Sequence, residues 1–208
     1  MLLAFLTTTG FAADDPSSDQ RIEALIQKLV SPNKAPEMRF GKTEGSGDYE
    51  QNARAMGAFS QLKKLGVGAF PLLFDHLDDQ RYSFTADRGD ADDNWSVGRA
   101  CFDIVRCQLE PFCGFSVPRN ETTDRGPPRP CYAAHINLRN PASAKVWWEA
   151  RKSKSLRELQ IEALQWAIAE EAKTPERYSD KERTKLQRVL AKLRVGNVPL
   201  APTVPWVR

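Results

Sequence analysis

An acidic stretch at residues 87–94 contains side chains that could coordinate a metal ion. Three of them have the 1-3-5 spacing at which an EF-hand loop begins its calcium ligands: Asp90, Asp92 and Asn94. Trp95 stands where that loop needs glycine, and Cys101 stands where it needs the bidentate glutamate. We therefore expect no metal and no cofactor, but a solvated loop whose Asp93 or Asn94 caps the next helix.

The two histidines, His76 and His135, could act as general bases if a carboxylate lies beside them. The candidate carboxylates are Asp75, Asp79 and Asp103. The chain contains no G-x-S-x-G, H-E-x-x-H or Cys-His signature of a known catalytic site. We therefore expect structural or solvent-facing histidines. The alternative is a small secreted enzyme, or an enzyme accessory subunit, that uses His135, His76 and nearby carboxylates.

Two adjacent tryptophans precede a basic segment and could form an aromatic and basic surface for a peptide or a glycan. They are Trp147 and Trp148, followed by Arg151, Lys152 and Lys154. Adjacent helical positions point in different directions, so at least one ring should face the core. The other hypothesis is that both rings pack beneath the segment 112–140. The residues that we select as binding candidates are Trp147, Trp148, Arg151, His135 and Tyr132.

The chain has four cysteines: Cys101, Cys107, Cys113 and Cys131. An even count in an exported protein allows two disulfides. Cys101 and Cys107 are six apart on a predicted helix, which separates their Cα atoms by about 9 Å along the axis. A disulfide needs less than about 7 Å, so that pairing is disfavoured. Cys113 and Cys131 could close a loop as a disulfide, and four reduced thiols are the alternative.

The overall composition is that of a soluble globular protein. The 208 residues include 41% hydrophobic residues, with 30 basic and 27 acidic residues well mixed along the chain. A net charge of +3 predicts no broad basic face of the kind that nucleic acid requires. No apolar run approaches the roughly 18 residues of a membrane-spanning helix.

The N-terminal segment MLLAFLTTTGFAA, residues 1–13, is apolar or small, and acidic residues follow it at once. This pattern is typical of a secretory signal with cleavage after Ala12 or Ala13, so we expect export to a periplasmic or extracellular compartment. No basic residue precedes the apolar run, and a cytoplasmic protein with an apolar N-terminus is the alternative.

Apolar residues at helical spacing predict most of the elements. Helices are expected at 19–30, 53–65, 69–77, 95–109, 142–150 and 155–172, with a last one ending at Leu193. Ser155 with Glu158, and Ser179 with Glu182, have capping-box spacing, and Asn140-Pro141 is a helix start. The proline-rich stretch 112–140 has no helical period, and a short strand is expected at 133–138.

Residues 53–105 resemble HEAT-like, armadillo-type repeats of the short bacterial kind. The matching runs are LKKLG at 62–66, GAFPLLFDHLDD at 68–79 and SVGRACFDI at 96–104. Val97 takes the family's valine position, Gly98 takes its arginine position, and Arg99 follows one residue late. About fifteen residues separate the second and third runs, where the family has only a few. The resemblance implies a fold and no catalytic residue.

The sequence thus predicts an all-α fold, an irregular HEAT-like stack of six or seven helices at residues 14–195. The segment 112–140 forms a long excursion, and a proline-rich tail follows at 196–208. Helical repeats stack through their apolar faces and carry many functions. We expect a non-catalytic module that binds or scaffolds an unknown protein partner, without nucleic acid and without a membrane span.

Overall fold

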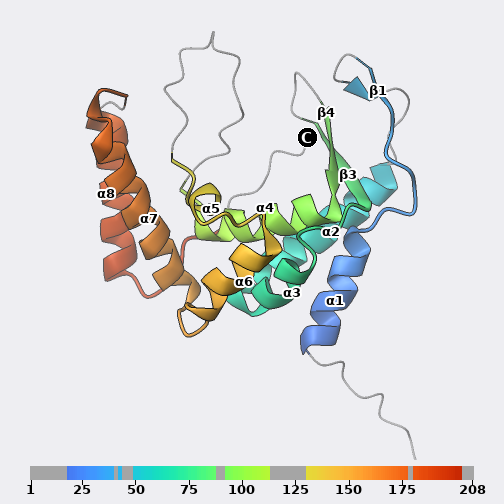
Figure 1. The fold of residues 1–208 in the computed structure, drawn as a ribbon, viewed down its shortest axis with the longest axis horizontal. Coiled ribbons are helices and arrows are strands. Elements are labelled where there is room, and N and C mark those ends of the chain that lie inside the picture. Colours follow the sequence, from blue (N-terminus) through green and yellow to red (C-terminus); the bar gives the residue numbers. More distant parts are fainter. Residues whose placement is uncertain are drawn as a thin grey trace, which may run out of the picture.

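The computed structural model describes residues 18–39, 42–43, 49–87, 92–112, 130–177 and 180–202. These residues form a mostly helical fold with two small β-hairpins (Figure 1). The helices are α1 (Ser18–Leu29), α2 (Tyr49–Lys64), α3 (Phe70–Asp75), α4 (Val97–Leu109), α5 (Tyr132–His135), α6 (Pro141–Glu149), α7 (Leu156–Lys173) and α8 (Asp180–Val195). The strands are β1 (Met38–Arg39), β2 (Lys42–Thr43), β3 (Tyr82–Asp87) and β4 (Asp92–Ser96).

Helix α4 is the centre of the fold. Eleven of its thirteen residues are buried, since α2, α3 and α7 all pack against it. In Figure 1 it runs between α1 and the β3–β4 hairpin at one end and the α7–α8 pair at the other. The main core includes the fully buried Phe59, Phe70 and Ile104 from α2, α3 and α4. The sequence prediction of a mostly helical fold is confirmed, while the irregular HEAT-like stacking of the helices remains a prediction.

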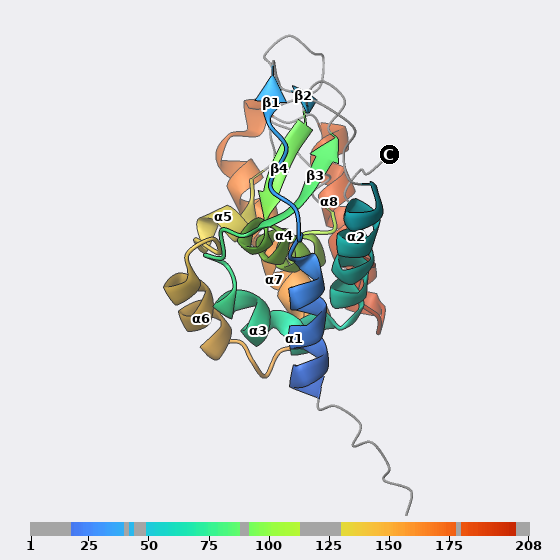
Figure 2. The ribbon, with the colours of Figure 1, turned by 90° about the vertical axis from the view of Figure 1, so that its right-hand side faces the viewer.

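The predicted polar loop before α4 is wrong, because Tyr82–Asp87 and Asp92–Ser96 pair as the antiparallel strands β3 and β4 (Figure 2). The register pairs Phe84 with Trp95, whose ring centroids lie 5.0 Å apart, and Phe59 of α2 packs edge-on against both rings. Burial of these aromatic rings stabilises the hairpin against the helices. Acidic residues follow Phe84 in the sequence, so the composition of this stretch indicated a loop and not strand β3.

Helix α4 begins two residues later than predicted because Trp95 and Ser96 belong to β4. The cap is Ser96, whose Oγ accepts a hydrogen bond from the N–H of Arg99 at 3.1 Å. Asp93 and Asn94 lie within the strand, so the prediction that one of them caps this helix is wrong. A serine at this position satisfies one of the first N–H groups that a helix leaves unpaired.

The strand predicted at 133–138 is also wrong, because the chain forms the short helix α5 there. Asn137 has a positive φ of 52° and ends this helix. The N–H of Leu138 donates to the carbonyl of Ala133, and the N–H of Asn137 donates to that of Ala134. This is the Schellman pattern, in which asparagine is one of the few residues that tolerate the left-handed conformation.

Helices α6 and α7 begin where the sequence predicts. The side chain of Asn140 accepts a hydrogen bond from the N–H of Ser143 at 3.0 Å, with Pro141 in the first turn. Ser155 and Glu158 form both hydrogen bonds of a capping box. Ser179, in the second predicted capping box, lies outside the described residues.

Helices α7 and α8 form a second, smaller core around Leu164, Ala167, Leu186 and Leu193. Gln160 connects this pair to the rest of the fold: its Nε2 donates to the carbonyl of Gln108 on α4 at 2.7 Å. Its Oε1 also accepts from the N–H of Leu200 at 2.8 Å, which holds the chain after α8. Among the described helices, none has the length and apolar character needed to cross a membrane.

Candidate binding site

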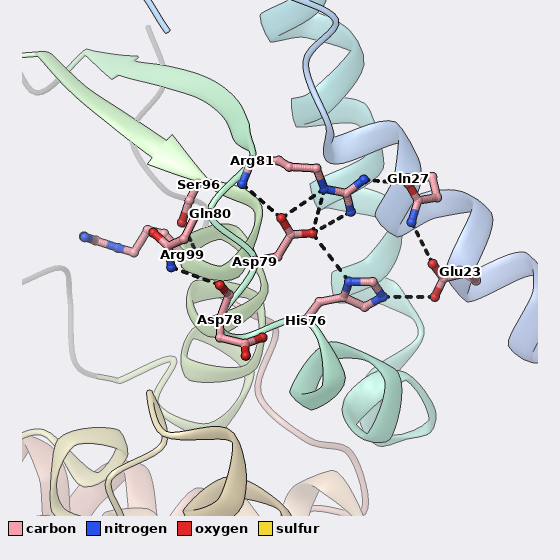
Figure 3. A network of polar contacts seen from close by, with 9 residues as sticks. All are labelled: Glu23, Gln27, His76, Asp78, Asp79, Gln80, Arg81, Ser96 and Arg99. Carbon is pink, nitrogen blue, oxygen red and sulfur yellow. Dashed lines mark hydrogen bonds and ion pairs between the residues drawn. The ribbon is translucent and has the colours of Figure 1, made fainter. Parts of the chain in front are cut away.

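The turn after α3 places His76 between two carboxylates (Figure 3). Its Nε2 lies 3.1 Å from Oε2 of Glu23 on α1, and its Nδ1 lies 3.7 Å from Oδ2 of Asp79. The histidine side chain is 19% exposed. Both ring nitrogens thus face carboxylates of the protein itself. This arrangement suits a structural link between α1 and α3 better than a general base, which needs a nitrogen turned toward substrate.

Arg81 holds Asp79 in a fixed orientation. Its Nε lies 3.0 Å from both carboxylate oxygens, and its backbone N–H donates to Oδ1 at 3.0 Å. Hydrogen bonds from the Arg81 side chain lower the pKa of Asp79 below its ordinary value. The pKa of Glu23 is also lowered, first by the hydrogen bond from Gln27 and then by His76. We call Glu23, Gln27, His76, Asp79 and Arg81 the His76 junction.

The same turn satisfies the start of α4. The N–H of Val97 donates to the carbonyl of Arg81, and the N–H of Gly98 donates to that of Asp79, both at 2.9 Å. A Cβ atom on Gly98 would lie 2.3 Å from the carbonyl oxygen of Leu77, closer than any side chain can pack. Position 98 therefore requires glycine, because the turn passes too close to the helix for a side chain.

A second group of polar contacts connects α5, α6 and α7. The Tyr132 hydroxyl donates to Oε1 of Glu162 and accepts from Nε1 of Trp147 at 3.2 Å. The Nε of Arg151 donates to the same Glu162 oxygen at 2.7 Å, and its guanidinium lies 5.3 Å from the centroid of the Trp147 ring. The cation is therefore held by a carboxylate and by the face of an aromatic ring.

Two further rings complete this group. His135 stacks on Trp166, with ring centroids 4.6 Å apart and planes inclined by 24°, and Tyr132 lies 5.7 Å from Trp166. These contacts join the end of α5 to the middle of α7, where a histidine uses its ring face as packing surface. We call the following residues the Tyr132 cluster: Tyr132, His135, Trp147, Arg151, Glu162 and Trp166.

The electrostatics of the Tyr132 cluster favour one protonation state. Burial raises the pKa of Glu162, but hydrogen bonds from Lys154, Tyr132 and Arg151 outweigh burial and hold this pKa below its ordinary value. Burial and the hydrogen bond to Glu162 raise the pKa of Tyr132 to about 12. Neither group changes charge near neutral pH, whereas a general acid or base works best when its pKa lies near the working pH.

Glu110, the residue after α4, caps α5. Its side chain is buried, and Oε1 accepts from the N–H of Tyr132 while Oε2 accepts from the N–H of Ala133 at 3.3 Å. The Sγ of Cys131 lies 3.5 Å from Oε2. Burial raises the pKa of Glu110 above its ordinary value despite the backbone hydrogen bonds. The sequence gives no sign of this cap, since local capping patterns do not span 22 residues.

A shallow apolar hollow of about 480 Å³ lies beside the Tyr132 cluster. Val146 on its wall is 72% exposed, although most large apolar side chains of the fold are buried. Trp147, which is 6% exposed, belongs both to the hollow and to the Tyr132 cluster. We call the following residues the Val146 hollow: Ile136, Ala142, Ser143, Val146 and Trp147. An apolar surface of this kind can receive a side chain from another molecule.

Four of the five binding candidates from the sequence meet in the Tyr132 cluster: Tyr132, His135, Trp147 and Arg151. Trp148 lies on the other side of α6, where it is buried edge-on against Phe70 and Phe74. The sequence pattern does not identify Glu162, Trp166 or Val146. The exposure of Val146 could have been predicted, because on a helix it lies on the face opposite to the buried Trp148.

The acidic stretch does not form a calcium loop in the part of the chain that the structure describes. Asn94 accepts a hydrogen bond from the Thr85 hydroxyl at 2.7 Å and donates to the carbonyl of Pro36 at 2.8 Å. Asp92 is in the β3–β4 ladder, and Asp90 lies outside the described residues. Nowhere in the described ranges do three His, Cys, Asp or Glu side chains gather in a way that could hold a metal ion.

The two histidines belong to separate groups, His76 to the junction and His135 to the Tyr132 cluster. Of the carboxylates proposed as their partners, only Asp79 contacts a histidine in the structure. The Asp75 carboxylate lies 2.6 Å from Nζ of Lys145. Asp103 is buried on α4 between the guanidinium groups of Arg99 and Arg106, each with its Nε at 2.8 Å. The alternative enzyme would therefore lack a single site that uses both histidines.

No disulfide joins the three cysteines that the structure describes: Cys101, Cys107 and Cys131. Burial raises the pKa of the Cys101 thiol, as expected for a small apolar core residue. Cys113, the predicted partner of Cys131, lies outside the described residues, and Cys131 is a thiol near Glu110. The structure thus gives the predicted disulfide between Cys113 and Cys131 no support.

Comparison of the chain with protein-family models, with curated proteins and with solved structures gives no match. The HEAT-like resemblance therefore remains a prediction that depends on the residues between 53 and 105.

Proposed function

We propose that this protein is a non-catalytic module that binds a protein partner through the Val146 hollow. The observation that supports this proposal is the exposure of Val146, at 72%, in an apolar hollow whose neighbours Trp147 and Tyr132 are buried. A single exposed valine carries no such meaning, but Val146 is continuous with the apolar walls of a hollow, and contiguous apolar surface can mark an interaction site.

The Tyr132 cluster supports the proposal by keeping the hollow in shape. Trp147 is fixed by its hydrogen bond to Tyr132 and by the guanidinium of Arg151, so the hollow is formed before any partner arrives. A preformed site loses less conformational entropy on binding. The irregular HEAT-like stack would serve as the scaffold, since stacked helices present rigid surfaces of this kind.

The enzyme alternative has less support. His76 faces Glu23 and Asp79, and His135 stacks on Trp166, so the two histidines serve two different contacts. Catalysis by proton transfer requires such groups to converge on one substrate.

Export is part of the proposal and is supported by the apolar segment 1–13. The mature protein should then begin at Ala13 or Asp14, which N-terminal sequencing of protein from the native host would establish. A protein that retains Met1 would contradict export without affecting the binding proposal.

The binding proposal can be tested by replacing Val146. The Val146→Glu protein should lose the polypeptides that the wild-type protein retains from a native-host extract, because a carboxylate in the hollow is costly to desolvate. The matched control is Val195→Glu at the end of α8, where the valine is 88% exposed. Both variants should keep the wild-type circular dichroism spectrum.

Two outcomes would contradict the proposal. Retention of the same polypeptides by the Val146→Glu protein would show that the hollow is not the binding surface. Equal losses for Val146→Glu and Val195→Glu would show that the effect is one of charge in general and is not specific to the hollow.

A further inference from the structure

Residues 139–154, which include four of the five residues that line the Val146 hollow, have a local excess of positive charge. Residues 139–154 contain five basic side chains and one acidic side chain, Glu149. The rest of the chain has 25 basic and 26 acidic residues and is therefore nearly neutral. The basic side chains of this segment are Arg139, Lys145, Arg151, Lys152 and Lys154. A charge excess in one short segment biases the surface toward partners of opposite sign.

Several of these cations are held loosely. Lys152 is 63% exposed and pairs with Glu149, which is 65% exposed, and Lys145 is 55% exposed and pairs with Asp75. Exposed ion pairs of this type contribute little to stability. Arg139 lies over the ring of Phe102 at 4.7 Å and has no acidic partner among the described residues. Carboxylates of a partner could therefore pair with these cations at little cost.

The lining of the hollow suits an apolar side chain. Its walls combine Ile136, Val146 and Trp147 with one hydroxyl, that of Ser143. That hydroxyl accepts from the side-chain amide of Asn137 at 3.3 Å, and its own proton can be donated to a carbonyl. An apolar anchor with flanking carboxylates and a peptide carbonyl would match these features.

We infer that the partner presents an acidic peptide segment, with an aliphatic or aromatic anchor in the Val146 hollow and flanking carboxylates on Arg139, Lys145 and Lys152. This inference depends on the proposed function, because it names the chemistry of the partner at the same site. A peptide is favoured over a membrane surface because the apolar area is a small hollow. It is favoured over nucleic acid because acidic side chains lie among the cations.

The experiment selects from a random twelve-residue peptide library on the immobilised full chain. The enriched peptides should combine at least two acidic residues with an aliphatic or aromatic residue. Their affinity is then measured by fluorescence anisotropy. Val146→Ala, which adds no charge, should weaken binding about tenfold by removing apolar contact area. Raising the salt concentration to 0.5 M should weaken it further, because salt screens exposed charges.

The charge is tested with a matched pair of variants. Lys152→Glu should weaken the binding of the acidic peptides about threefold to tenfold, the usual range for charges at the rim of an interface. Lys173→Glu is the control, because Lys173 is 66% exposed and also pairs with a glutamate three residues away. The control should leave the affinity unchanged.

The outcomes separate this inference from the proposed function. Enriched peptides that depend on Val146 but are basic or neutral would overturn the acidic partner and leave the binding function standing. If no peptide is enriched, or if the enriched peptides bind the Val146→Ala protein equally well, both the acidic partner and the proposed binding function are contradicted. Tighter binding of anionic lipid vesicles or of single-stranded oligonucleotides, with the same dependence on Val146 and Lys152, would overturn the peptide in favour of that class.

Discussion

The His76 junction and the Tyr132 cluster both combine a histidine with carboxylates, but they use these groups differently. In the junction, His76 lies between Glu23 and Asp79, and Arg81 binds the second carboxylate. The junction is partly exposed and fastens α1 to the turn before β3. In the Tyr132 cluster, the single carboxylate of Glu162 binds the Tyr132 hydroxyl and the side chains of Arg151 and Lys154. His135 contributes only its ring face, which stacks on Trp166.

The comparison separates two roles of polar contacts: those of the His76 junction hold helices together, and those of the Tyr132 cluster also shape a surface. Every titratable side chain of the His76 junction faces another one, so the junction has a structural role. The Tyr132 cluster is equally well connected, yet it fixes Trp147 at the edge of an uncovered apolar hollow. A histidine beside carboxylates is thus a poor guide to function unless some surface nearby is left for a ligand.

The largest expected effect comes from the backbone contact beneath the His76 junction. Gly98→Ala should lower the free energy of unfolding by about 2–4 kcal/mol, because its Cβ would lie 2.3 Å from the carbonyl oxygen of Leu77 and the backbone must move. Chemical denaturation measures this change. The matched control is Gly57→Ala on α2, where a Cβ meets no atom within 4 Å, and it should stabilise the protein by up to about 1 kcal/mol.

Equal stability of the two alanine variants would contradict this close approach. A loss of stability in Gly98→Ala that leaves peptide binding intact would sharpen the comparison, because it would separate the junction from the Val146 hollow.

An intermediate effect is expected at the ionic part of the junction. Asp79→Asn should destabilise the protein by about 1–2 kcal/mol at pH 7, since the guanidinium of Arg81 loses its counter-charge. Asp79 has a lowered pKa in the fold, so its contribution is complete above its ordinary value of 3.8 and is lost as the pH falls through the lower folded value. The difference between wild type and variant should therefore shrink in acid.

Urea titrations between pH 7 and pH 3 measure this dependence. Asp75→Asn is the control, because Asp75 is 51% exposed in its pair with Lys145, and we expect a change below about 0.5 kcal/mol. A difference between wild type and Asp79→Asn that grows in acid would contradict the assigned role of Asp79.

A smaller effect is expected in the Tyr132 cluster. Tyr132→Phe should cost about 1–1.5 kcal/mol, because Nε1 of the buried Trp147 loses its acceptor and Glu162 loses a donor. The pKa of Tyr132 is raised to about 12, so its hydroxyl contributes stability below pH 10 that is lost as the pH rises through 12. The difference between the two proteins should shrink in alkali.

Thermal unfolding at pH 7 and pH 10.5 measures this loss. Tyr82→Phe is the comparison, since the half-buried Tyr82 hydroxyl contacts Thr85 and its removal should cost less. Tyr132→Phe should also weaken peptide binding if the cluster shapes the hollow, whereas unchanged affinity would show that the hollow forms without it.

Local signals in the sequence predicted the helices well. The capping box at Ser155 and the start at Asn140-Pro141 are contained within four residues, so their geometry follows from neighbours along the chain. The errors at 82–96 and 133–138 have a different cause. The hairpin depends on Phe84 and Trp95 packing against Phe59 of α2, and the short α5 depends on Glu110. Neither partner lies within the local window of the pattern.

The sequence predicted which residues form the candidate site, but it did not predict how they are placed relative to one another. Aromatic and basic residues at 147–154 indicated a binding surface, and four of the five selected residues do meet. The Val146 hollow, however, depends on the turn after α5, where Asn137 adopts a positive φ and brings Ile136 beside α6. The packing of Ile136 against residues of α6 is not visible in composition or periodicity.

The sequence by itself determined the helical class, the helix boundaries with local caps and the basic segment that follows Trp147 and Trp148, because these properties depend on residues close together in the chain. The tertiary structure alone decided which polar groups satisfy one another and which apolar surface stays uncovered. Glu162, 30 residues from Tyr132, and Glu23, 53 residues from His76, acquire their roles only when the helices pack. Burial and hydrogen bonding are properties of the packed chain, and no window of sequence contains them.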